Sequence, residues 1–193
     1  MFTYLNKELK FDRYEQSFLW LKDAGVAIPV YNVQEPVVPL EQSRSSNLFK
    51  LFQSDVGLLT SCYPALLRRQ IMEADDLTFV NVGPLFENYV ACELRAAGQQ
   101  VLYYKTAKLG EVDFITEVDG QVVPIEVKSG RDYKKHSALD HLLAAPDYRI
   151  PQAVVLSPHE LEVDGPIFYC PIYMASLIRS SVPDRARLDI HIF

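Results

Sequence analysis

The feature that most constrains the fold is a two-residue turn, Asp119-Gly120, between two strand-like segments. These segments run from Glu111 to Val118 and from Gln121 to Lys128. An Asp-Gly pair between two such segments is the strongest short-range signal for a β-hairpin, because both central residues of the turn need a positive φ. The turn predicts that Val118 faces Gln121, and this pairing fixes the register of both strands.

Counting back from the turn, the register places Asp113 opposite Glu126 and Glu111 opposite Lys128. It predicts an ionisable face made of these four side chains. The reverse face would be apolar and would consist of Val112, Phe114, Val123, Ile125 and Val127. Like charges that face each other across two strands destabilise the pair by roughly 0.2–1 kcal/mol. Asp113 and Glu126 therefore predict a compensating cation.

Paired carboxylates favour Mg²⁺ or Mn²⁺, which bind oxygen ligands together with water and substrate phosphate. Lys128 follows Glu126 by two residues and so points to the same face. There it can orient or deprotonate a metal-bound water, or stabilise charge on a phosphate. This arrangement predicts metal-assisted phosphodiester hydrolysis. The alternative is an exposed face on which Glu111 and Lys128 form a cross-strand ion pair and Asp113 is solvated.

A predicted helix upstream supplies a further acidic residue, Glu87. Gly83-Pro84 is typical of a helix start and Gly98 of a helix end. Apolar side chains recur between them at helical spacing, at Leu85, Phe86, Tyr89, Val90, Leu94 and Ala97. Glu87 falls at the edge of this stripe, from where it can reach the hairpin. Alternatively, it serves only as a favourable charge at the positive end of the helix dipole.

The order of these elements resembles the core of the PD-(D/E)XK, or restriction-endonuclease-like, nucleases. That core is an α/β fold with a mixed central sheet flanked by helices. The matching elements are a helix at 84–97, strands at 100–105, 111–118 and 121–128, a helix within 134–145 and a strand at 152–157. The resemblance implies that Asp113, Glu126 and the Val127 carbonyl bind the metal, that Lys128 serves the attacking water, and that Glu87 assists the metal or the water.

Four stretches are also similar, in the same order, to a C-terminal domain of unknown function that follows the winged helix in bacterial and archaeal AAA-type ATPases. They are Lys50-Leu51-Phe52 with Asp55-Val56-Gly57-Leu58-Leu59, Phe86-Glu87-Asn88-Tyr89-Val90 with Glu93-Leu94, Glu111-Val112-Asp113-Phe114, and Pro124-Ile125-Glu126-Val127-Lys128-Ser129-Gly130. The chain has no Gly-x-x-x-x-Gly-Lys-Ser/Thr loop to bind nucleotide phosphates. We therefore expect a fragment or a separate gene product, with an AAA-type ATPase as partner.

The N-terminal segment, 1–33, is predicted to contain a helix at 4–24 and a strand at 27–33. By resemblance, this segment is the remnant of a winged helix. A linker rich in proline and serine follows at 34–47, and the nuclease-like domain occupies 48–193. A partial winged helix leaves apolar surface uncovered, so we expect it to pack on the core, on a separate chain or on a second copy in a homo-oligomer.

The net charge of −6 opposes indiscriminate binding to nucleic acids, because such binding depends on cationic groups. A basic group does follow the Lys128 strand. We expect Arg131, Lys134 and Lys135 to contact DNA, either branched or single-stranded. The alternative is an ordinary basic loop that balances nearby acids such as Asp132.

The sequence shows no apolar run of about 18 residues and no basic-then-apolar start, which predicts a cytoplasmic protein without membrane contact. Three widely spaced cysteines, Cys62, Cys92 and Cys170, indicate reduced and mostly buried thiols. The leading functional prediction is Mg²⁺-dependent hydrolysis of DNA. The competing prediction is a non-catalytic nucleic-acid-binding or regulatory module that works with an AAA-type ATPase.

Overall fold

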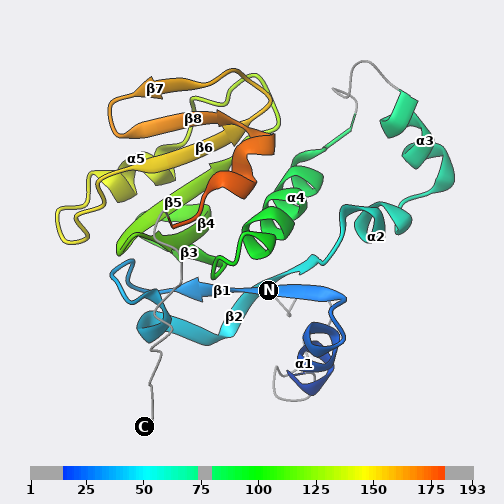
Figure 1. Ribbon diagram of the computed structural model, residues 1–193, viewed down its shortest axis with the longest axis horizontal. Helices are drawn as coiled ribbons and strands as arrows, with labels where there is room; N and C mark the ends of the chain where they lie inside the picture. The colour runs from blue at the N-terminus through cyan, green and yellow to red at the C-terminus, as the bar shows by residue number, and fades with distance from the viewer. Residues whose placement is uncertain (1–14, 74–79, 181–193) are drawn as a thin grey trace, which may run out of the picture.

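An eight-stranded mixed sheet forms the centre of the computed structural model, which describes residues 15–73 and 80–180 (Figure 1). The strand order is β2-β1-β3-β4-β5-β6-β8-β7. The pairs β1–β3, β5–β6 and β6–β8 are parallel, and the other neighbours are antiparallel. The strands are β1 (Ala27–Val33), β2 (Arg44–Gln53), β3 (Leu102–Thr106), β4 (Gly110–Val118), β5 (Gln121–Val127), β6 (Ala153–Ser157), β7 (Glu162–Asp164) and β8 (Ile167–Pro171).

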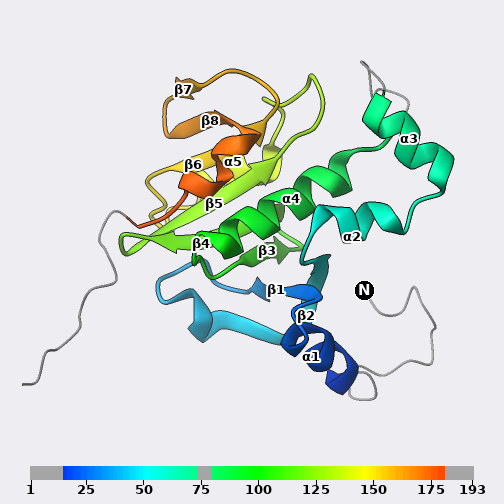
Figure 2. The same ribbon diagram turned by 45° about the vertical axis from the view of Figure 1, so that its right-hand side comes forward.

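Helices cover both faces of this sheet, which confirms the predicted α/β fold with a mixed, helix-flanked sheet (Figures 1 and 2). On one face lie α4 (Gly83–Ala96) and the 3-10 helix η4 (Ile172–Leu177); on the other lies α5 (Ser137–Leu143). Each face has its own core. Leu94 is fully buried in the α4-side core, and Leu142 is fully buried in the α5-side core.

The remaining helices are α1 (Glu15–Asp23), η3 (Leu40–Ser43), α2 (Val56–Ser61) and α3 (Ala65–Glu73). Of the helix predicted at 4–24, the part before residue 15 lies outside the described residues. Within the described ranges, no helix combines the length and apolar character that a membrane span requires. The three cysteines are free thiols, but the prediction that they are mostly buried is wrong: Cys62 is exposed, and Cys92 and Cys170 are only partly buried.

The N-terminal strand has the predicted bounds and is part of the same sheet as the predicted core. β1 pairs antiparallel with β2 and parallel with β3. Arg44 to Asn47, predicted as the end of a linker, instead begin β2. Their Ser-rich composition favours a loop, but pairing with β1 overrides this local preference: Arg44 pairs with Val33, and Ser45 is buried.

The helix α4 begins and ends close to the predicted positions. Pro84 occupies its first turn, and Gly98 follows it with a φ of 78°, a left-handed conformation that favours glycine. The buried side of α4 differs in part from the predicted stripe, because Asn88 and Ala91 are buried while Phe86 and Tyr89 are only partly buried.

The β4–β5 hairpin confirms the predicted turn and the register next to it. Asp119 and Gly120 both have positive φ, at 50° and 74°, and Val118 pairs with Gln121. The pairing continues to Phe114 and Ile125 and ends there. Asp113 and Glu126 are therefore not ladder partners, and neither are Glu111 and Lys128; that part of the predicted register is wrong.

The reason for this difference lies in the pairing of β4 with β3. Tyr104 pairs with Val112 and Leu102 with Ile115, so β4 has one residue more than β3 between these two pairs. An additional residue of this kind reverses the alternation of side chains. Val112 consequently belongs to the α5-side core and Phe114 to the α4-side core, whereas the sequence predicted that they share a face.

Candidate functional site

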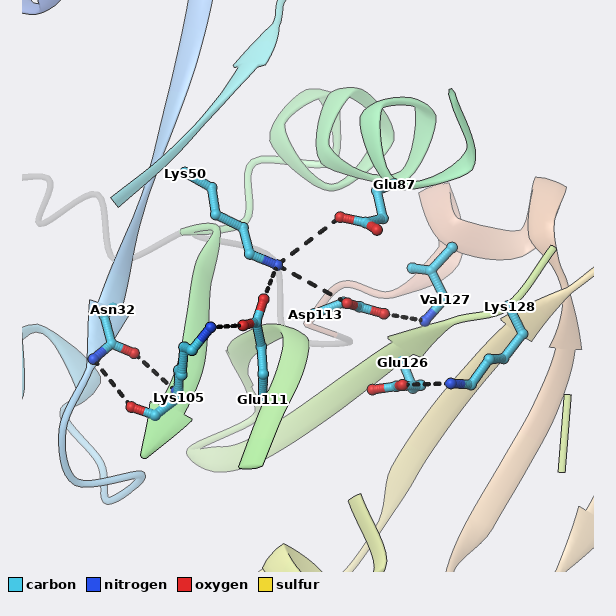
Figure 3. Close-up of polar contacts among 9 residues, drawn as sticks. All are labelled: Asn32, Lys50, Glu87, Lys105, Glu111, Asp113, Glu126, Val127 and Lys128. Carbon is cyan, nitrogen blue, oxygen red and sulfur yellow. Dashed lines mark hydrogen bonds and ion pairs between the residues drawn. The ribbon is translucent and has the colours of Figure 1, made fainter. Parts of the chain in front are cut away.

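Asp113 lies where β4 and β5 separate, and its two carboxylate oxygens have different partners (Figure 3). Its Oδ2 accepts a hydrogen bond of 2.9 Å from the backbone N–H of Val127, and its Oδ1 faces Lys50. Burial raises the pKa of Asp113, although the Val127 N–H and the charge of Lys50 act against this rise. The separation of the strands thus places a strongly desolvated carboxylate at the edge of the hairpin.

Lys50 lies among three carboxylates and was not assigned to the site from the sequence. Its Nζ is 2.7 Å from Glu111 Oε1 and 3.9 Å from both Glu87 Oε2 and Asp113 Oδ1. Burial lowers the pKa of Lys50, but the hydrogen bond to Glu111 and the charges of Asp113 and Glu87 more than compensate, so this pKa is raised. Lys50 therefore carries a positive charge at neutral pH.

Two features of the fold bring Lys50 and Glu87 together. Lys50 lies two residues before Phe52 on β2 and so shares its α4-side face. The side chain of Asn88 accepts a hydrogen bond of 2.8 Å from the Gln53 N–H and donates one of 3.1 Å to the Gln53 carbonyl. Because Asn88 follows Glu87 directly, this pair of hydrogen bonds fixes the Glu87 turn of α4 against β2.

Glu111 is paired with lysines from two neighbouring strands. It is opposite Lys105 on β3 and forms ion pairs with both Lys105 and Lys50. Asn32 of β1 holds the backbone of Lys105 through hydrogen bonds to its N–H and its carbonyl (Figure 3). Burial favours a higher pKa for Glu111, but the two lysine hydrogen bonds lower it overall. The Glu111–Lys128 ion pair considered from the sequence is thus replaced by pairs with Lys105 and Lys50.

Glu126 is the most unusual carboxylate of the site. Its Oε1 accepts a hydrogen bond of 2.7 Å from Lys128 Nζ, whereas its Oε2 is buried and has no hydrogen-bond partner among the described residues. The residue is only 7% exposed. Burial, and then the charge of Asp113, raise the pKa of Glu126 to about 7. Leaving such a buried polar atom unpaired costs about 1–3 kcal/mol.

We call Glu87, Glu111, Asp113 and Glu126 the carboxylate cluster. Burial, and then the charge of Asp113, also raise the pKa of Glu87. The structure thus brings the four predicted catalytic residues, Glu87, Asp113, Glu126 and Lys128, to the place where β4 and β5 separate (Figure 3). Glu87 reaches it from α4, whereas Glu126 alternates with Ile125 and Val127 and so points away from α4. Val127 contributes its N–H to Asp113; metal binding by its carbonyl stays a prediction.

The donor chemistry of the cluster fits a hard divalent cation. All its donors are carboxylate oxygens, which suit Mg²⁺ and Mn²⁺. It is unfavourable to keep these carboxylates charged, as shown by the raised pKa values of Glu126, Asp113 and Glu87 and by the unpaired Glu126 Oε2. A bound cation would remove this electrostatic cost. Across residues 15–73 and 80–180, no three His, Cys, Asp or Glu side chains are already arranged as a metal-binding group.

The residues predicted to contact DNA lie in the loop before α5. Lys134 Nζ is 2.6 Å from Glu162 Oε1, and Lys135 Nζ is 3.0 Å from Asp132 Oδ1. Two of the three predicted cations are thus engaged within the chain, and the Lys135–Asp132 pair matches the alternative of a self-balancing loop. Arg131 is exposed.

Residues 82–173 match a family described as a domain of unknown function, DUF4143. This match agrees with the domain of unknown function predicted from the sequence. The matched segment contains the whole carboxylate cluster and Lys128, but it does not contain Lys50. No curated protein and no solved structure matches the chain.

Proposed function

We propose that this chain contains a metal-dependent nuclease domain that hydrolyses DNA phosphodiester bonds. The observation that carries the proposal is the state of Glu126: buried, with one unpaired oxygen, next to Asp113 and hydrogen-bonded to Lys128. Desolvated acids beside a lysine are a recurrent feature of active sites, where pKa values are shifted to suit the chemistry. The order of the elements from α4 to β6 supports the finer assignment to a PD-(D/E)XK core. The assignment of residues 1–33 to part of a winged helix rests on the sequence resemblance alone, because β1 belongs to the same sheet as the core.

Asp113 and Glu126 would hold Mg²⁺ or Mn²⁺, with Glu87 and the Val127 carbonyl as further ligands. When bound, such an ion lowers the pKa of water and stabilises negative charge on a phosphate. With a pKa of about 7, Glu126 gives up its proton near neutral pH, so ion binding and proton release are coupled. Lys128 Nζ, held beside Glu126 Oε1, can donate a hydrogen bond to the attacking water or to the phosphate.

A second candidate function is a non-catalytic nucleic-acid-binding or regulatory module that works with an AAA-type ATPase. The observation that favours it is Lys50, whose ammonium already offsets the charge of Glu111, Asp113 and Glu87 without a metal. The internal ion pairs of Lys134 and Lys135 also leave fewer cations for DNA. In this case the chain would bind branched or single-stranded DNA, or its ATPase partner, without cleaving it.

Calorimetric titration of Mg²⁺ and Mn²⁺ tests the first step of the proposed reaction. Wild type should bind saturably, and Asp113→Ala should not. Asp164→Asn is the matched control, since Asp164 is an exposed carboxylate on the edge strand β7. Absence of saturable binding to wild type, even with DNA present, would refute the proposal.

Cleavage assays with branched and single-stranded DNA test the chemistry itself. Lys128→Met should reduce the rate by about 100-fold or more, because an interaction made with the transition state is lost. Lys108→Met, which removes an exposed lysine outside the cluster, is the control. Unchanged cleavage by Lys128→Met would contradict the assigned role, and DNA binding without any cleavage would favour the second candidate.

A further inference from the structure

We propose that Lys50 is a built-in competitor of the divalent cation, which lowers the metal affinity of the carboxylate cluster. This inference rests on the proposed function. It concerns a residue that comes from outside the matched family segment and reaches the site from the edge strand β2. Figure 3 shows the Lys50 side chain extending from β2 toward Glu87, Glu111 and Asp113.

The contacts of Lys50 divide into one close pair and two longer ones. Glu111 Oε1 is 2.7 Å from its Nζ, whereas Glu87 Oε2 and Asp113 Oδ1 are both 3.9 Å away. Glu111 thus holds the ammonium in place. From this position, the positive charge of Lys50 acts on Glu87 and Asp113, two of the carboxylates that would serve as metal ligands.

The surroundings of Lys50 limit how far it can move away from the cluster. Its side chain is 23% exposed, and its Nζ lies 5.2 Å from the ring centroid of Tyr103, within the range of a cation–π interaction. Glu111 is in turn held by Lys105, whose backbone is fixed by Asn32. The ammonium is therefore part of a supported arrangement on the α4 side of the sheet.

A divalent ion bound by Asp113 and Glu87 would lie close to this ammonium. Like charges at such separations in a partly desolvated site repel each other strongly, and screening by salt is weaker there than at the surface. The ion would either bind against this repulsion or displace Lys50 from its contacts with Asp113 and Glu87. In both cases Lys50 makes binding weaker, and its removal should make binding tighter.

Lys105 offers a matched control for this effect. It is also a lysine paired with Glu111, but its only ion pair within the described residues is with Glu111. Removing Lys105 changes the net charge of the chain by the same amount as removing Lys50. A general charge effect would therefore act equally in both variants, whereas competition at Asp113 and Glu87 would act mainly in the Lys50 variant.

The test is calorimetric titration of Mn²⁺ into wild type, Lys50→Met, Lys50→Gln and Lys105→Met, with Asp113→Ala as the variant without a site. We expect Mn²⁺ to bind Lys50→Met about tenfold or more tightly than wild type, because one repelling charge is removed. Lys105→Met should change the affinity much less. Lys50→Gln, which keeps a hydrogen-bond donor near Glu111, covers the case in which the methionine variant does not fold.

Melting temperatures give a second readout that needs no catalytic activity. Without metal, Lys50→Met should melt below wild type, because the carboxylates lose their counter-charge, and Mn²⁺ should raise its melting temperature more than that of wild type. Equal Mn²⁺ affinity in wild type and Lys50→Met, lost in Asp113→Ala, would overturn the competition while leaving the proposed function intact. Weaker binding by Lys50→Met would also overturn it. No saturable binding in any variant, even with DNA present, would refute the proposed function and the competition together.

Discussion

Two regions of the molecule, the His136 side chain with its partners and the carboxylate cluster, differ in how their buried polar groups are satisfied. On the α5 side, His136 is 6% exposed, and both ring nitrogens have partners: Nδ1 lies 2.9 Å from Asp140 Oδ1, and Nε2 lies 2.8 Å from Tyr169 Oη. We call these three residues the His136 network. At the carboxylate cluster, Glu126 is equally buried but keeps an unpaired oxygen beside a second carboxylate. The first arrangement is satisfied by its own chain, whereas the second keeps a buried carboxylate oxygen unpaired within the described residues, the place where we propose that a cation binds.

Buried polar groups with and without partners have different consequences for stability and for ligand binding. A buried polar group with all its partners contributes to packing and to a unique structure. A buried carboxylate with a raised pKa and an unpaired oxygen weakens the fold, and it indicates a ligand that would remove this cost. Metal titrations and unfolding measurements should therefore separate the two regions.

The largest expected effect is on metal binding. Asp113→Asn should lower Mn²⁺ affinity by at least about 100-fold, because even residues that only support a metal ligand are worth 10–100-fold. Asp140→Asn removes a carboxylate from the His136 network and should leave Mn²⁺ affinity unchanged. A stronger loss of Mn²⁺ affinity in Asp140→Asn than in Asp113→Asn, measured by calorimetry, would contradict the placement of the metal at the carboxylate cluster.

Loss of the His136 side chain should mainly affect stability. His136→Ala leaves the buried Tyr169 hydroxyl without its partner and creates a cavity, which should cost about 2–3 kcal/mol of unfolding free energy. Urea unfolding measures this change.

In contrast, metal-free Asp113→Asn should be no less stable than wild type, since it relieves repulsion with Glu126 and keeps an acceptor for the Val127 N–H. A large destabilisation by Asp113→Asn would show that its charge is structural.

The raised pKa of Glu126 makes the stability of the protein depend on pH. The pKa of Glu126 is raised from 4.5 to about 7 in the folded protein. The unfolding free energy is therefore highest below pH 4.5, where Glu126 is protonated, and it falls as the pH rises through about 7 and the buried carboxyl becomes charged. Metal-free Glu126→Gln should therefore match the unfolding free energy of wild type near pH 4.5 and exceed it at pH 8 by about 3 kcal/mol, the free-energy equivalent of this pKa shift.

Unfolding titrations at both pH values test this difference. Comparison with the variant isolates Glu126 from Glu87 and Asp113, whose pKa values burial also raises. A wild type that gained stability relative to Glu126→Gln as the pH rose would contradict the assigned burial cost. If Glu126 is a metal ligand as proposed, added Mn²⁺ should reverse the order of the two proteins at pH 8, because Glu126→Gln would lack one of the proposed carboxylate ligands.

The smallest effect is expected at the protein surface. Lys134→Met removes the ion pair with Glu162, in which both side chains are nearly half exposed. Such pairs contribute little to stability because water and salt screen them. The unfolding midpoint should stay within experimental error of wild type, and DNA affinity should fall only slightly. A marked loss of DNA affinity would show that Lys134 leaves Glu162 to contact DNA, as the sequence suggested.

The parts of the fold predicted well from the sequence depend on local signals. The Asp119-Gly120 turn carries its own backbone preference, so it fixes the hairpin as far as Phe114 and Ile125. Pro84 and Gly98 likewise mark the ends of α4. The predicted residues Glu87, Asp113, Glu126 and Lys128 lie on or next to these elements, but their final positions depend on contacts beyond the locally determined part of the hairpin.

The parts that were missed depend on distant pairing. The additional residue in β4 follows from the register with β3, which no pattern within the hairpin reveals. Lys50 reaches the cluster from β2, whose first residues have the composition of a loop. A usable signal was present: Lys50 is a charged residue between Phe49 and Leu51, in a segment that also belongs to the resemblance with the ATPase-associated domain. A cation within an apolar strand indicates a buried counter-charge.

The pairing of β1 with β3 determines how much of the chain must be kept for folding studies. A polypeptide shortened to the matched segment, 82–173, would lose β1 and β2, and β3 would become the rim of the sheet. Its unpaired backbone would then offer a template for strands of other molecules, a common origin of aggregation. We therefore expect that a polypeptide able to fold alone must include β1, from Ala27 onward, and that the 82–173 polypeptide would accumulate in inclusion bodies.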